Sequence, residues 1–282
     1  MEFAPFQEIL PGRPLTGAWL AALAAVLICF TVVWLISLKK RDVSIVDIAW
    51  GPAFVLSALV FALHRGALPA GGETRISSLA GVYLGLLALW GLRLAWHIGA
   101  RHKGEDYRYA EMRRKGGPSF PFKSLWRIFY LQAALVAVIG LPHLFIQLGE
   151  RPPEPQWSDW LGLALFAIGF FFEAVGDWQL QRFRDDPANQ GKVLRTGLWR
   201  YTRHPNYFGD ATLWLGFAFG ALASQGGWIG FFSFALELFL LLKVSGVVLL
   251  EKTIVKRRPE YEDYIAATPA FFPWFPKRPA ER

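Results

Sequence analysis

Long uninterrupted apolar runs are the feature that most constrains the fold of this chain of 282 residues. A helix needs about 17–25 mostly apolar residues to cross a bilayer, and seven stretches reach or approach that length. Only 18% of the residues are charged, against about 25% in an average soluble domain. The sequence therefore predicts an all-α integral membrane protein with about seven transmembrane helices. They are expected at about 16–38, 44–64, 77–100, 125–148, 157–180, 207–225 and 227–250.

Basic residues alternate between the connections, which predicts an orientation. Of the 30 Lys and Arg residues, 24 lie at 39–41, at 101–127, at 182–203 and beyond residue 251. The positive-inside rule places these segments in the cytoplasm, so the N-terminus is expected outside and the C-terminus inside. Topology and contact with lipid headgroups explain most of these cations, and nucleic acid is not expected as a partner. We expect an N-terminal tail at 1–15 and a single membrane domain at 16–282.

Cysteine usage and the first apolar run bear on the compartment. Cys29 is the single cysteine, so no intrachain disulfide can form, and no metal site is expected from cysteine spacing. The first run is too long for a signal peptide and lacks a basic stretch before it, so we expect a retained helix. The bacterial inner membrane is the expected location, with the endoplasmic reticulum as the eukaryotic equivalent. Membrane lipids are expected contacts, and no obligate protein partner is evident.

Several charged residues fall inside the apolar runs. Each costs about 2.5–3.5 kcal/mol near the bilayer centre and is therefore a functional candidate. Asp47, Arg93, Glu173 and Asp177 all lie in the half of their runs nearest the basic connections. This clustering predicts a polar cavity open to the cytoplasm. Mutual neutralisation of Asp47 and Arg93 stays open beside a catalytic role.

A basic segment precedes the sixth apolar run and ends in RHPNYFGD at 203–210. Pro205 favours the first turn of a helix, whose unpaired amides and dipole attract anions. Arg and Lys beside such a helix start suit a pyrophosphate or a 2′-phosphate. Asn206 and Asp210 would lie one turn apart, in reach of an amide or a ribose hydroxyl. Tyr261 and Tyr264, after the last run, are suited to stacking on an adenine.

The segments GLWRYTRHPNYFGD (197–210) and RRPEYEDY (257–264) resemble the steroid 5-alpha-reductase superfamily, nearest to its bacterial branch with a domain of unknown function. Isoprenylcysteine carboxyl methyltransferases and sterol reductases share the RHP-x-Y part, and Asp210 is closer to the sterol-reductase form. The resemblance covers roughly residues 40–275. It implies a seven-helix membrane enzyme that transfers hydride from NADPH to an electron-poor carbon–carbon double bond.

The resemblance also implies a cofactor-binding half at about 157–275. Glu173, Asp177 and Arg184 match the polar face of the family's fifth helix, and the basic segment from Arg184 to Arg195 would hold phosphates. The expected cofactor-binding residues are Glu173, Asp177, Arg184, Asn189, Lys192, Arg195, Tyr201, Arg203, His204, Asn206, Tyr207, Asp210, Glu251, Arg257, Tyr261 and Tyr264. Several Arg near the ribose favour NADPH over NADH.

The sequence departs from the family where the substrate would bind. The family's Gln-Glu pair and its Tyr, which polarise a steroid ketone, have no counterpart here. Asp47, Trp50, Trp90 and Arg93 are the candidate catalytic residues instead, with Arg93 and Asp47 stabilising negative charge or relaying a proton. The expected activity is NADPH-dependent reduction of a polarised C=C bond in a lipidic small-molecule substrate, steroid-like or another enone.

Two other functions stay open. An S-adenosylmethionine-dependent methyltransferase of the isoprenylcysteine type would also need a cytoplasmic cofactor pocket, but its cofactor carries no phosphate to occupy the cations. A catalytically silent lipid-binding membrane protein of the same fold would explain the missing Gln-Glu and Tyr. It would not explain why the cofactor-binding residues remain.

Overall fold

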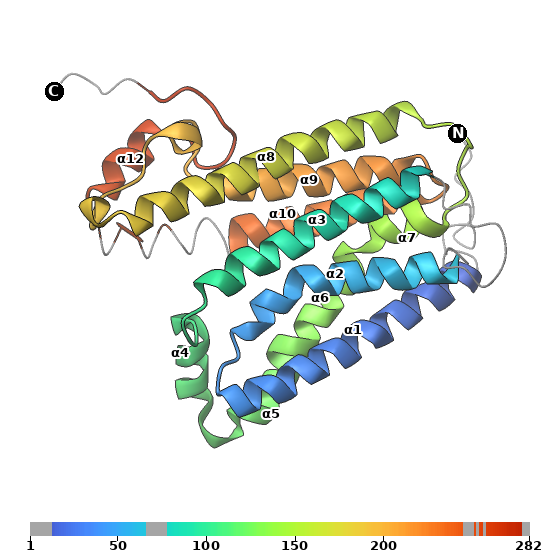
Figure 1. Ribbon diagram of the computed structural model, residues 1–282, viewed down its shortest axis with the longest axis horizontal. Coiled ribbons are helices and arrows are strands. Elements are labelled where there is room, and N and C mark those ends of the chain that lie inside the picture. The colour runs from blue at the N-terminus through green and yellow to red at the C-terminus, as the bar shows by residue number, and fades with distance from the viewer. Residues whose placement is uncertain (1–12, 66–77, 245–250, 252–253, 256–257, 278–282) are drawn as a thin grey trace. The chain divides into compact units, whose positions relative to one another are not determined.

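The computed structural model describes residues 13–65, 78–244, 251, 254–255 and 258–277 (Figure 1). These residues form helices, turns and loops, with no strand among them. By compactness they divide into two units, which are described separately. Unit 1 takes its described residues from 1–156 and 221–230, and unit 2 from 157–220 and 231–282.

Unit 1 is built on three long helices, of which α1 (Arg13–Lys40) and α3 (Ser78–Arg101) both pack on α2 (Ile45–His64). Shorter elements follow: α4 (Tyr107–Gly116), η2 (Gly117–Ser119), α5 (Phe120–Ser124), η3 (Leu125–Tyr130), α6 (Leu131–Ile139), α7 (Leu141–Leu148) and η6 (Gly227–Ile229). The closest approach of α2 and α3 is at Gly51 and Gly91, where a Cβ on either residue would collide with the backbone of the other.

Unit 2 contains α8 (Trp157–Asp185), η4 (Pro187–Asn189), η5 (Gly197–Arg200), α9 (Pro205–Leu222), α10 (Gly230–Phe239), η7 (Leu240–Val244) and α12 (Tyr261–Ala267). Helices α8 and α9 run antiparallel in close contact. A Cβ on Gly209 would meet the backbone of Glu173, and one on Gly216 would meet the backbone of Gly162. The N-terminal half of α9 therefore lies beside the C-terminal half of α8.

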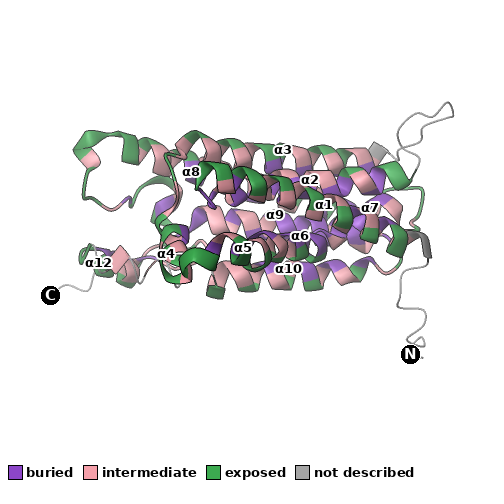
Figure 2. Ribbon diagram, turned by 90° about the horizontal axis from the view of Figure 1, so that it is seen from below, coloured by how far each residue is buried: buried purple, intermediate pink, exposed green. Residues whose placement is uncertain are grey.

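Within the described part of the chain, six stretches are long and apolar enough to cross a membrane: Leu15–Lys40, Ile45–His64, Leu79–Arg101, Tyr107–Ile139, Trp157–Asp185 and Gly227–Val244. Their outward faces carry exposed apolar side chains, such as Ile28 and Leu92, which are 66% and 57% exposed (green in Figure 2). Apolar faces of this extent are typical of lipid contact. The chain is a multi-pass membrane protein. Helix α9, at the predicted sixth run, is not among the six, and seven spans and the orientation stay predictions.

Two predicted segments look different in the structure. The run at 125–148 is not one regular helix, because it opens with the π-helical turn η3 and is interrupted at Gly140, between α6 and α7. The basic connection at 101–127 is largely helical. Asp106 caps α4 by accepting a hydrogen bond from the backbone N–H of Arg108 at 2.9 Å. The polar surface of α4 hides this helix from a search for apolar runs.

Candidate functional site

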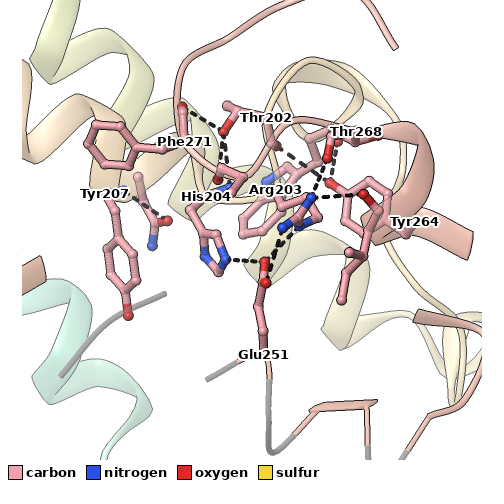
Figure 3. Close-up of polar contacts among 12 residues, drawn as sticks. Thr202, Arg203, His204, Tyr207, Glu251, Tyr264, Thr268 and Phe271 are labelled. Atoms are coloured by element: carbon pink, nitrogen blue, oxygen red, sulfur yellow. Dashed lines mark hydrogen bonds and ion pairs between the residues drawn. The ribbon is translucent and has the colours of Figure 1, made fainter. Parts of the chain in front are cut away.

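Arg203, His204 and Glu251 form a buried ion cluster at the start of α9, called the clasp below (Figure 3). Arg203 Nε and Nη2 donate to the two carboxylate oxygens of Glu251 at 2.6 and 3.0 Å, and His204 Nε2 lies 3.0 Å from Oε1. Arg203 is 6% exposed and His204 2%. Burial opposes ionisation of Glu251, but the bonds from His204 and Arg203 outweigh it and lower its pKa to about 2. Glu251 is therefore ionised at neutral pH.

The clasp fastens the segment that follows α12 onto the start of α9. Arg203 Nη1 donates to the carbonyl oxygens of Ile265, at 3.1 Å, and of Thr268. The hydroxyl of Thr202 donates to the carbonyl of Phe271 at 2.8 Å (Figure 3). The guanidinium of Arg203 is thus engaged by a carboxylate and two carbonyls of its own chain, and it holds two segments together.

The two predicted stacking tyrosines are also part of this loop. Tyr264 is 2% exposed, and its hydroxyl donates to the carbonyl of Trp199. Tyr261 is 5% exposed and packs edge-on against Tyr264 at 5.4 Å between ring centroids. Burial comes first among the causes that raise the pKa of both phenols. Both rings belong to the packed interior of unit 2.

Three exposed cations, Lys192, Arg195 and Arg258, lie around the same loop and are called the basic rim below. Arg258 donates through Nη1 to the carbonyl of Lys192, and Arg195 donates through Nη2 to the carbonyl of Glu260 at 2.6 Å. These bonds bring residues 192–195 and 258–260 together. Arg258 was missed by the sequence reasoning, although it adjoins the expected Arg257, which lies outside the described residues.

Polar side chains of α8 and α9 meet inside unit 2. Asn206 Nδ2 donates to Asp177 Oδ1 at 3.2 Å, and Asp177 is only 7% exposed. Glu173, one turn earlier on α8, is 4% exposed. Asp210 is hydrogen-bonded to Glu237 of α10, which is 6% exposed. The structure therefore brings Asp177 and Asn206 together, and it adds Glu237, whose sequence signal was a carboxylate inside an apolar run.

The remaining expected cofactor residues lie around these groups. Tyr207 stacks on the ring of His204, with centroids 5.4 Å apart. Asn189 donates through Nδ2 to Asp186 at 3.1 Å and shapes the turn before Lys192. Tyr201 follows η5, and Arg184 is exposed near the end of α8.

In unit 1, the candidate catalytic Asp47 is paired with α4. The hydroxyl of Tyr109 donates to Asp47 Oδ1 at 2.7 Å, and Arg108 Nη2 lies 3.5 Å from Oδ2. Tyr109 is 9% exposed. Neither partner was expected from the sequence. The signal that could have found them is Asp106, a helix-capping residue type that begins α4 and sets Tyr109 in its first turns.

A polar network next to this pair fixes the start of α2. Asp42 accepts hydrogen bonds from the hydroxyl of Ser44 and from His102 Nε2, both at 2.6 Å. Burial opposes ionisation of Asp42, but these bonds outweigh it and lower its pKa. Arg113 donates twice to Glu105, which also accepts from the backbone N–H of Val43 at 2.9 Å. The network orients the turn that carries Asp47.

The other candidate catalytic residues lie along the α2–α3 contact. The ring of Phe54 packs edge-on against Trp50 at 5.0 Å and against Trp90 at 5.8 Å between centroids. Trp90 is 1% exposed, whereas Trp50 is half-buried. Arg93 is half-buried and lies one turn beyond Trp90 on α3. The two tryptophans therefore share an aromatic cluster through Phe54.

Comparison with known proteins gives one family and several distant relatives. A family described as "Protein of unknown function (DUF1295)" matches residues 33–268. An uncharacterized protein of Schizosaccharomyces pombe is 27% identical over 293 residues, 92% of this chain and 80% of that protein. Human 3-oxo-5-alpha-steroid 4-dehydrogenase 1 is 31% identical over 94 residues, 33% of this chain and 36% of that protein.

A fungal relative has a different kind of name. The probable O-methyltransferase ustE of Ustilaginoidea virens is 31% identical over 109 residues, 39% of this chain and 36% of that protein. The chain thus spans about a third of the length of each of these two named relatives. No solved structure matches the chain.

Proposed function

Since the chain belongs to the DUF1295 family, in the steroid 5-alpha-reductase superfamily, we propose that it is an NADPH-dependent membrane reductase. Its substrate is a lipidic small molecule with a C=C bond polarised by a carbonyl group. The observation that carries the proposal is the basic rim, three exposed cations around the loop that precedes α9. A cofactor with a diphosphate and a 2′-phosphate fits such a rim, because these groups supply the anionic oxygens that Lys and Arg bind.

The cofactor-binding residues divide by role in this proposal. Lys192, Arg195 and Arg258 bind the phosphates. The clasp acts indirectly, because Arg203 is already engaged by Glu251 and two carbonyls, and it shapes the loop that carries the rim. Among the polar groups of α8 and α9, Asp177 offers a carboxylate and Asn206 an amide to the cofactor.

The proposal also needs a hydrogen-bond donor to the substrate. When bound, NADPH supplies a hydride, and alkene reduction needs a proton as well. In such a reduction the electron pair of the C=C bond would move toward the carbonyl oxygen of the substrate. Tyr109 is the proposed hydrogen-bond donor to that oxygen, and its hydroxyl, which donates to Asp47 Oδ1 in this structure, would turn to the substrate. Solvent returns the second hydrogen to the α carbon as a proton.

A ligand titration of the detergent-purified protein tests the cofactor. A ligand that binds only the folded state stabilises it by about 2.7 kcal/mol at a hundredfold excess over its dissociation constant. We expect NADPH to raise the melting temperature more than NADH does, and S-adenosylmethionine to leave it unchanged. Lys192→Gln and Arg195→Gln should each weaken NADPH binding about tenfold, since a hydrogen bond to a charged group contributes about 1.5–3 kcal/mol.

Arg200→Gln is the matched control for the rim, because Arg200 is an equally exposed cation on η5. Arg200→Gln should leave the affinity for NADPH within about twofold of the wild type. The corresponding change in binding free energy is smaller than the 1.4 kcal/mol of a tenfold change. Equal losses in all three variants would mean that only net charge matters. Unchanged affinity in both rim variants would remove the rim from the cofactor site.

A methyltransferase is the second candidate, favoured by the match to the probable O-methyltransferase of Ustilaginoidea virens. It predicts stabilisation by S-adenosylmethionine and none by NADPH in the same titration. No stabilisation by any of the three ligands would favour a lipid-binding protein without catalysis.

A further inference from the structure

Three large aromatic side chains are displayed on the segment that follows α12. Phe272, Trp274 and Phe275 are 72%, 71% and 71% exposed. Their backbone is nevertheless held in place, because the N–H of Trp274 donates to the carbonyl of Tyr201 at 2.9 Å. Residues 271–275 are called the aromatic segment below. Its exposure is thus a property of a fixed conformation, and an apolar surface of this kind requires a partner.

Exposed tryptophans of α8 indicate where this helix crosses the membrane surface. Trp160 and Trp178 are 62% and 56% exposed, and at 1.5 Å per residue they lie about 27 Å apart along the helix. The hydrocarbon core of a bilayer is about 30 Å thick, and exposed Trp residues gather at both of its interfaces. The guanidinium of Arg182 lies 5.6 Å from the ring centroid of Trp178, as expected where a span meets headgroups. Trp178 therefore marks one interface.

Two hydrogen bonds link the level of Trp178 to the loop before α9. Trp199 Nε1 donates to the carbonyl of Gly176 at 3.1 Å, and the backbone N–H of Leu198 donates to Gln179 Oε1 at 3.0 Å. Gly176 and Gln179 flank Trp178 on α8. The loop at η5 is therefore at the level of the interface.

The aromatic segment lies against that same loop. The rings of Phe275 and Tyr201 are 5.8 Å apart, and Tyr201 directly follows η5. The ring centroid of Phe272 lies 6.3 Å from that of Phe208 of α9. The ring centroid of Phe208 in turn lies 5.0 Å from that of Phe172 of α8. Phe172 is about 9 Å from Trp178 toward the bilayer centre. Figure 1 shows α12 and the segment after it at one end of α8.

We propose that the aromatic segment is a membrane-interface anchor, which inserts Trp274 and Phe275 among the lipid headgroups, and Phe272 just below them, in the bilayer that the chain itself spans. Depth selects the bilayer over a protein partner, because the loop that holds the segment is level with Trp178. The surrounding charge also favours the bilayer, since the exposed cations Arg200 and Lys277 flank the segment and would contact anionic headgroups. The anchor rests on no catalytic property, so its test is independent of the proposed function.

Depth-dependent fluorescence quenching tests the anchor in the full chain. Cys29 is the only cysteine and is replaced first, by Cys29→Ala. Phe275→Cys, Phe272→Cys and, as a control, Glu262→Cys on α12 are then labelled with the same environment-sensitive fluorophore. Each labelled protein is placed in nanodiscs of phosphatidylcholine and phosphatidylglycerol. The quenchers are lipids with a nitroxide at the headgroup or along the acyl chain, and aqueous iodide.

We expect the label at 275 to be quenched most by the headgroup nitroxide, the label at 272 by the shallow acyl-chain nitroxide, and the label at 262 by iodide. Both replaced phenylalanines are more than 70% exposed, so the variants should retain the helical circular dichroism of the parent. Iodide quenching at 275 equal to that at 262 would overturn the anchor. Quenching at 275 by a nitroxide near the bilayer centre would overturn it as well.

Discussion

Tyr109 and Asp47 are joined by one hydrogen bond of 2.7 Å, so a single oxygen atom can be removed to test them. In Tyr109→Phe the ring stays and the donor is lost. Removing one hydrogen-bond donor to a developing oxyanion costs about 10²–10³-fold, so turnover of a lipidic enone should fall by that factor. Stabilisation by NADPH should stay unchanged, because unit 2 supplies the cofactor residues in the proposal. The measurement is kcat with each variant beside a thermal-shift titration.

Tyr107→Phe provides the control for Tyr109, since Tyr107 is 56% exposed and begins the same helix. Its turnover should match the wild type. If Tyr109→Phe keeps wild-type turnover, Tyr109 is not the hydrogen-bond donor to the substrate, whatever the cofactor titration shows.

The clasp predicts a loss of stability and a change in its pH dependence. Glu251→Gln leaves the buried Arg203 charge without its carboxylate, and breaking a buried pair costs about 3–5 kcal/mol. In the wild type the pKa of Glu251 is lowered from 4.5 to about 2. A lowered folded-state pKa stabilises the protein fully above the unfolded value, and this contribution is lost as the pH falls toward 2.

Thermal unfolding in detergent at pH 7, 4.5 and 3 measures both effects. The variant should melt lower than the wild type at pH 7, and the gap should narrow at pH 3. A gap that stays constant across this range would show that the ionisation of Glu251 contributes nothing.

Single residues were predictable from the sequence where their surroundings in the chain were unusual. Asp47, Asp177 and Glu173 stand out as carboxylates inside apolar runs, and Asn206 stands out in the RHPNYFGD motif. The residues that pair with them were harder to predict from the sequence. Tyr109 lies in a polar segment without apolar periodicity, and Glu251 is 48 residues from Arg203, so only the folded chain brings these pairs together.

At the scale of helices, the α2–α3 contact predicts opposite effects of two glycine substitutions on one helix. In Gly91→Ala the new Cβ would meet the carbonyl oxygen of Gly51, and overpacking costs about 1–3 kcal/mol. In Gly85→Ala the Cβ has open space around it, so the gain in helix propensity of up to about 1 kcal/mol remains. Melting temperatures of the two variants in one detergent check this. Equal shifts would mean that the helices do not touch at Gly91.

Helix positions were predictable because long apolar runs leave few alternatives. The runs at 44–64 and 77–100 match α2 and α3 within one residue at each end. Breaks and bends within an apolar run were not predictable in this way. The turn at Gly140 and the π-helical η3 divide the predicted run at 125–148, because apolar composition alone does not report where a helix bends. The part of the last run at 245–250 lies outside the described residues.

At the scale of the whole molecule, the number of crossings decides which sides the termini occupy. Helix α9 is not among the six apolar stretches, yet Gly209 and Gly216 lie against α8 between the exposed Trp160 and Trp178. This contact supports the prediction that α9 also crosses. Seven crossings predict an N-terminus outside and a C-terminus in the cytoplasm.

Membrane-impermeant labelling of short tags at the two ends of the chain checks the topology in sealed vesicles of one orientation. One tag should react from outside and the other only after the vesicles are opened. Two tags on the same side would mean an even number of crossings and would exclude seven.

The clasp also sets an order of events during biosynthesis. Arg203 and its acceptor Thr268 are 65 residues apart, so at about 5–20 residues per second the ribosome makes them about 3–13 s apart. Until then the loop before α9 lacks the segment that closes it, although α8 and α9 are already complete. Nascent chains that stop before Glu251 would therefore carry inserted helices with an open loop, which quality-control proteases can recognise.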